Sequence, residues 1–314
     1  MTEGAADGWT ALPVPPSLLG ESPFWHPDEA ALYWCDIPGR ALHRFVPGSG
    51  EHRCWSLDAE PGCCAPLPGT ALLLAMRDGL FRFEPDEGQR GERTLLAAPP
   101  YDTSEQRFND GKADPLGRLW VGTIHEPRDG PRAALYRYAV GRIDRIAGDA
   151  TVANALAFSP DARTMYWGDT TSHRIDAFDY DLAAGAVSNR RVFVQFAPKP
   201  VGFDPAAVAA GDLARYGGRP DGAAVDAEGC LWAAMYEGQR LVRIDPQGRV
   251  CETLPLPVRC PTMPCFGGAD LRTLFVTTAR EGRPPAELAA QPLAGAVLTK
   301  RVAVPGLPVN FARV

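Results

Sequence analysis

Polar residues that could carry chemistry stand before apolar segments at four widely separated places in the chain. The places are LGESPFW, RFNDGKADPLGRLW, VANALAFSPD and GRPDGAAVDAEGCLW, and their candidate residues are Glu21, Arg107, Asn109, Asp110, Asn154 and Asp221. Carboxylate and amide oxygens suit hard cations such as Ca²⁺, Mg²⁺ or Mn²⁺. Arginine and asparagine hydrogen-bond to hydroxyl and carbonyl oxygens. A fold that brings these places together would build a site for a metal ion and a polar small molecule.

The elements that would position these residues form a repeat. An aspartate or glycine turn precedes an apolar or aromatic strand, which is followed by a second turn and a strand of the type Leu-x-Arg-aromatic. The six copies begin at Ala31, Ala71, Arg118, Thr164, Cys230 and Thr273. They are spaced by about 40 to 47 residues, with about 65 before the fifth, which is typical of four-stranded propeller blades. The predicted fold class is all-β, a six-bladed β-propeller whose innermost strands converge on a central channel.

The 32 glycines and 31 prolines lie between short apolar runs, and helical periodicity is almost absent. We expect residues 1–314 to form a single propeller domain. The long gap contains residues 198–218, whose alanine-rich centre predicts a short helix after Asp204 and Pro205 in a rim insertion or lid. The segment around Trp9 and the C-terminal residues 296–306 could supply strands to one composite blade that closes the ring.

Charge and hydropathy limit the classes of partner. The formal net charge is −6 and the basic residues are scattered, which disfavours nucleic acid and anionic membranes as partners. Without a secretion signal or a long apolar run, we expect a cytoplasmic protein whose eight cysteines are reduced. A closed propeller without an apolar surface stripe predicts a monomer whose partner is a small molecule.

The chain resembles the gluconolactonase, senescence marker protein 30 and regucalcin family over nearly its whole length. The RFNDGK run at residues 107–112 is the most specific feature of the resemblance. The other segments that carry it are Gly20–Pro23 with Trp25, Asp114-Pro115, Gly117-Arg118, Gly122-Thr123, Asn154–Asp161, Pro220–Gly222 with Asp226 and Gly229, and Phe266–Gly268 before Leu274. The resemblance implies a six-bladed propeller with one divalent metal ion in its channel.

The resemblance also implies roles for individual residues. Glu21, Asn154 and Asp221 would hold the ion, which could be Ca²⁺, Mn²⁺, Mg²⁺, Zn²⁺ or Fe²⁺, and Arg107 and Asn109 would contact the substrate. Such an ion can polarise a lactone carbonyl and lower the pKa of bound water, with Asp221 as the general base. The predicted function is metal-dependent hydrolysis of sugar lactones to aldonic acids, a carboxylic ester hydrolase activity.

Two departures from the family pattern concern the substrate. Ala155 follows Asn154 where the family has glycine, and the acidic residue expected after Gly122-Thr123 is displaced. Glu126 lies near the position of a substrate-contacting glutamate in some members, so it is a further substrate-binding candidate, and the neighbouring His125 could reach the channel. The identity of the sugar therefore stays open.

Other interpretations compete with these. Glu21 could instead cap a turn, and Asn154 and Asp221 could form Asx turns between strands. Arg107 could pair with a surface carboxylate, and Asp110 is better explained as a structural turn residue. The five histidines lack zinc-site spacing, and the pairs Cys63-Cys64 and Cys260/Cys265 lack CxxC spacing, which predicts buried or loop thiols. Two other functions are a propeller esterase acting on aryl lactones or organophosphates, and a non-catalytic propeller that binds metal or a protein.

Overall fold

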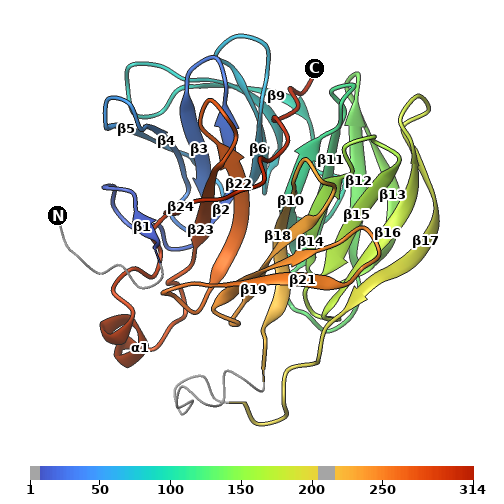
Figure 1. Ribbon diagram of the computed structural model, residues 1–314. Coiled ribbons are helices and arrows are strands. Elements are labelled where there is room, and N and C mark those ends of the chain that lie inside the picture. Colours follow the sequence, from blue (N-terminus) through green and yellow to red (C-terminus); the bar gives the residue numbers. More distant parts are fainter. Residues whose placement is uncertain (1–7, 204–215) are drawn as a thin grey trace.

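Six four-stranded antiparallel sheets make up the computed structural model, which describes residues 8–203 and 216–314 (Figure 1). The first strand of each sheet contacts the first strands of both neighbouring sheets, so these six strands form a closed ring around the channel. The arrangement confirms the predicted all-β six-bladed propeller.

The strands fall into four concentric sets. The innermost are β2 (Gly20–His26), β6 (Pro61–Pro66), β10 (Gln106–Ala113), β14 (Ala153–Phe158), β18 (Arg219–Val225) and β22 (Pro261–Gly267). The second are β3 (Ala31–Asp36), β7 (Leu72–Met76), β11 (Leu119–His125), β15 (Thr164–Asp169), β19 (Leu231–Tyr236) and β23 (Thr273–Thr278). The third are β4 (Ala41–Val46), β8 (Gly79–Glu84), β12 (Ala133–Ala139), β16 (Arg174–Asp181), β20 (Arg240–Ile244) and β24 (Leu298–Arg301). The outermost are β5 (Glu51–Ser56), β9 (Glu92–Ala97), β13 (Arg142–Ala150), β17 (Ala186–Gln195), β21 (Val250–Pro255) and β1 (Thr10–Ala11).

Burial falls from the channel outward. Every residue of β2 and β3 is buried, whereas most of β17 is exposed. The inner strands therefore consist largely of apolar and small residues, because both of their faces pack against neighbouring blades. The tryptophans of the second strands lie in this core, as the repeat predicts, and they are Trp34, Trp120, Trp167 and Trp232.

The two ends of the chain close the ring. Strand β1 pairs antiparallel with β24, Thr10 opposite Thr299 and Ala11 opposite Leu298. The adjacent Trp9 is buried, and its indole N–H donates to the Pro255 carbonyl at 2.8 Å. The predicted composite blade is confirmed, and it removes the open edges that an unclosed ring would expose.

The described part of the chain contains one short helix besides its strands. Helix α1 (Pro285–Ala290), which the sequence pattern did not predict, lies between β23 and β24 (Figure 1). Its Glu287 is bound by two arginines, at 2.9 Å from Arg283 and 3.3 Å from Arg259. Within residues 8–203 and 216–314, no helix has the length and apolar character that a membrane span requires. Residues 204–215 of the predicted 198–218 insertion lie outside the described residues, so its helix and lid stay predictions.

A buried aspartate fixes the turn before the second strand of the fifth blade. One carboxylate oxygen of Asp226 accepts hydrogen bonds from the Trp232 indole at 2.9 Å and from the Arg243 guanidinium at 2.8 Å. Asp114 holds the corresponding tryptophan of the third blade in the same way. These bonds tie the Asp226 turn to β19 and β20, and the Asp114 turn to β11.

Replacing Asp226 with alanine is expected to lower the free energy of unfolding by about 3 kcal/mol, because Arg243 and the indole N–H would lose a buried partner. Urea unfolding measures the change. The matched control is Asp179→Ala on β16, whose half-exposed carboxylate pairs with Arg191 at 2.8 Å and should contribute less than about 1 kcal/mol. Equal losses for the two variants would contradict this role for Asp226.

Candidate functional site

A β-bulge interrupts the pairing of every innermost strand near its start. The register shifts fall at Glu21/Phe24, Pro61/Cys63, Phe108/Gly111, Asn154/Ala157, Pro220/Ala223 and Pro261/Met263. A bulge adds a residue, bends the strand and re-aims the side chains beside it. Ala155 accordingly has φ +54°, in the left-handed region where glycine is at no disadvantage. This conformation explains why glycine suits that position.

Residues at the bulges line a cavity of about 450 Å³, here called the polar cavity. All of the predicted metal and substrate residues line it, namely Glu21, Arg107, Asn109, Glu126, Asn154 and Asp221. The fold thus brings together residues from four blades. His125 is not among the lining residues; it is buried, and its Nε2 lies 2.6 Å from Asp129.

A chain of hydrogen bonds orients the amide side chains of the polar cavity across three blades. Arg107 Nη1 donates to Asn109 Oδ1 at 2.7 Å, so the Asn109 amide group donates to Asn154 Oδ1 at 3.0 Å. The Asn154 amide donates to the Thr170 hydroxyl at 2.8 Å, and that hydroxyl donates to the Pro220 carbonyl at 2.7 Å. Donor and acceptor are defined in each of these hydrogen bonds. The orientations of the Asn109 and Asn154 amide groups are therefore fixed.

Two carboxylates are buried in the polar cavity. Burial raises the pKa of Glu21 well above its usual value, and the charges of Asp221 and Asp110 raise it further. Burial also raises the pKa of Asp221, with Asp110 adding to the rise and Arg219 and Arg107 opposing it. Negative charge in this cavity is therefore only partly compensated by the protein.

The donors of the polar cavity fit a hard divalent cation. Within the described part of the chain, no group of three or more His, Cys, Asp and Glu side chains is arranged to hold a metal. The predicted ligands, however, are two carboxylates and the amide oxygen of Asn154. A bound cation would stabilise the ionised forms of Glu21 and Asp221, which burial and repulsion disfavour.

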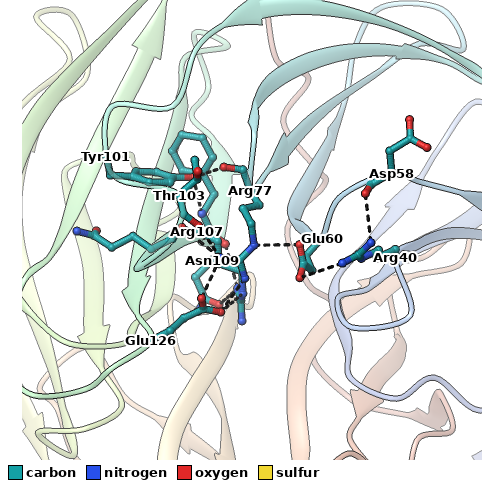
Figure 2. A network of polar contacts seen from close by, with 11 residues as sticks. Arg40, Asp58, Glu60, Arg77, Tyr101, Thr103, Arg107, Asn109 and Glu126 are labelled. Atoms are coloured by element: carbon teal, nitrogen blue, oxygen red, sulfur yellow. Dashed lines mark hydrogen bonds and ion pairs between the residues drawn. The ribbon is translucent and has the colours of Figure 1, made fainter.

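A salt-bridge network connects the polar cavity to the first two blades (Figure 2). Arg77 binds both oxygens of Glu126, at 2.9 and 2.8 Å, and its Nε donates to Glu60 at 3.0 Å. Arg107 Nε lies 3.6 Å from the same Glu126, and Arg40 lies 3.9 Å from Glu60. Arg77 thus holds the carboxylate that borders Arg107.

Sequence reasoning missed several residues of the polar cavity because, apart from His125 and Glu126, it considered only positions before the innermost strands. In an antiparallel blade, the end of the second strand lies beside the start of the first. Arg128, Thr170 and Glu281 follow second strands and line the polar cavity. Their position in the repeat was the signal that could have identified them. Arg219 and Tyr236 also line the polar cavity.

Asp110 and the cysteines have other surroundings. One oxygen of Asp110 accepts a hydrogen bond from the Leu156 backbone N–H at 2.8 Å, which joins the third and fourth blades. This contact agrees with the structural role favoured for Asp110. All eight cysteines are free thiols, with Cys54 and Cys251 exposed and the others buried.

Comparisons with known proteins agree with this architecture. The family model described as SMP-30/Gluconolactonase/LRE-like region matches residues 19–280. The 6-deoxy-6-sulfogluconolactonase of Pseudomonas putida is 41% identical over 93% of this chain and 94% of the relative. Regucalcin of Gallus gallus is 33% identical over 92% of this chain and 93% of the relative. A crystal structure of the calcium-binding protein regucalcin from Agrobacterium tumefaciens has a TM-score of 0.87 at 28% identity, covering 98% of this chain and 97% of that one. The chain belongs to the SMP-30/gluconolactonase/LRE-like family.

Proposed function

We propose that this chain hydrolyses sugar lactones to aldonic acids and uses one divalent metal ion bound in the polar cavity. The observation that carries the proposal is the grouping of two buried carboxylates with oriented amides and Arg107 in one cavity. The lactonase name of the Pseudomonas putida relative supports it. The calcium-binding description of the Agrobacterium tumefaciens regucalcin supports the choice of a hard cation.

Each residue has a defined task in this proposal. Glu21, Asp221 and the amide oxygen of Asn154 would hold the ion. When bound, a divalent ion polarises a carbonyl oxygen and makes a bound water more acidic. The Asp221 carboxylate can accept a proton from the attacking water. Asn109 holds Arg107 through Nη1, so Arg107 can donate to the lactone through Nη2.

The polar cavity also suits a lactone that carries a negatively charged substituent. Arg128 is exposed at its rim, and within the described residues its side chain makes no hydrogen bond or ion pair. Arg219 lines the same cavity, and its guanidinium lies over the Tyr236 ring at 5.4 Å. Arg219 also lies 3.6 Å from the Glu237 carboxylate. Together, Arg128 and Arg219 can bind a sulfonate, phosphate or carboxylate group. Anionic sugar lactones therefore belong among the substrates to be tested.

The function is tested by hydrolysis of aldono-1,4-lactones and aldono-1,5-lactones, neutral and anionic, by chelator-treated protein with and without Mn²⁺, Mg²⁺, Ca²⁺ or Zn²⁺. We expect an added ion to restore acid release above the spontaneous rate. The Asp221→Ala variant should lose at least about a hundredfold in rate, because it lacks a ligand and the general base.

The surface variant Asp179→Ala is the control and should match the parent protein. Hydrolysis that is unchanged by chelation or by Asp221→Ala would contradict the proposed mechanism. Turnover of aryl esters without turnover of any sugar lactone would favour the esterase interpretation. Metal binding without turnover of either class would favour a binding protein.

Replacing Arg77 with glutamine tests how the network supports the substrate site. Glu126 would lose its bidentate partner and pair with Arg107 instead. This pairing would draw the Arg107 guanidinium away from Asn109. We expect KM to rise about tenfold, roughly the value of one charge-assisted hydrogen bond, with a smaller change in kcat. Steady-state kinetics measure both constants.

Arg77→Lys should restore part of the affinity, because lysine keeps the charge without the planar fork. Arg82→Gln is the matched control, since Arg82 pairs with Glu84 at 2.5 Å on the third strand of the same blade. A KM for Arg77→Gln equal to that of the control would refute this role for Arg77.

A further inference from the structure

The channel contains a second cavity beyond the bulges of the innermost strands. Its volume is about 360 Å³, within the range of small-molecule pockets. All six innermost strands contribute to its lining, for example through Trp25, Ala65, Ala157 and Phe266. In four blades, residues before the bulge line the polar cavity. In all six blades, residues after the bulge line this second cavity, here called the apolar cavity.

The C-terminal segment covers the far end of this apolar cavity. Residues 307–310 are part of its lining. The segment is tied to opposite sides of the ring, because the Leu307 N–H donates to Val225 at 3.3 Å and the Ala312 N–H donates to Pro66 at 2.7 Å. In Figure 1 the C-terminus accordingly lies at the opposite end of the propeller from α1. The C-terminal segment thus forms part of the cavity wall, and the cavity stays partly open to solvent.

Among the described residues that line the apolar cavity, Lys112 is the only one with a formal charge. Burial raises the pKa of Cys63, Asp110 and Cys265, and the charge of Lys112 opposes each rise. These three residues belong to β6, β10 and β22, and Lys112 itself is half-buried on β10. Within the described residues Lys112 has no hydrogen bond or ion pair.

We propose that the apolar cavity is a binding site for a small monocarboxylate with an apolar body, whose carboxylate pairs with Lys112. The apolar walls favour displacement of water by a hydrocarbon chain or ring. A single lysine matches one negative charge, whereas a dianion would leave a charge unpaired among apolar side chains. The uncharged polar atoms of Ser22, Ser159 and Asn310 also line the cavity and add no second cation.

Calorimetric titration with octanoate and with 1-octanol tests this site in the parent protein and in Lys112→Met. Methionine keeps the length and apolar stem of lysine but removes the charge. We expect octanoate to bind the parent protein at one site, and Lys112→Met to bind it at least about tenfold more weakly, the value of one charge-assisted contact. Binding of 1-octanol should be the same in both proteins.

Absence of octanoate binding, or equal octanoate affinity in the two proteins, would overturn the proposal. A crystal structure of the parent protein with octanoate is the second measurement, which does not depend on the variant folding. It should place the carboxylate at Lys112 Nζ, and a carboxylate anywhere else would also overturn the proposal. Neither measurement uses lactone turnover, so failure here leaves the proposed hydrolase activity untouched.

Discussion

The burial of Glu21 and Asp221 at one end of the channel is the constraint on which the other features of the site depend. Buried carboxylates are costly unless positive charge and hydrogen-bond donors surround them. Arg107 and Arg219 supply part of that charge, and the Ser22 backbone N–H donates to Glu21 at 3.2 Å. The remaining deficit is what a divalent cation would supply. The hydrogen bonds through Asn109 and Asn154 fix two amide groups in the lining of the same cavity.

The six bulges divide the channel into two chemically different halves. Before the bulge the innermost strands contribute carboxylates, amides and arginines, and after it they contribute alanine, proline and aromatic residues. Closure of the ring by β1 and β24 makes this division possible, because all six strands must hold their positions at once. The buried Asp114 and Asp226 add local rigidity, because each binds the tryptophan of the strand that follows its turn.

Much of this arrangement could be predicted from the sequence because it follows from a repeat. The repeat predicted the blades, the core tryptophans and the convergence of polar residues that precede innermost strands. The composite blade was predictable because a ring must close, which left Trp9 and the C-terminal segment as candidates. Helix α1 was not predictable, since its Glu287 also binds Arg259, which a distant segment contributes. The pairing of Arg77 with Glu126 was missed for the same reason: side-chain directions between blades do not follow from spacing.

The proposed function depends on the binding of one divalent ion in the polar cavity by Glu21, Asn154 and Asp221. The most direct test is an electron paramagnetic resonance titration of chelator-treated protein with Mn²⁺, comparing the parent protein with Glu21→Gln. We expect one tightly bound Mn²⁺ per chain in the parent protein and at least about a tenfold loss of affinity in Glu21→Gln, because glutamine keeps the shape but not the charge. No bound Mn²⁺, or equal binding in the two proteins, would contradict it.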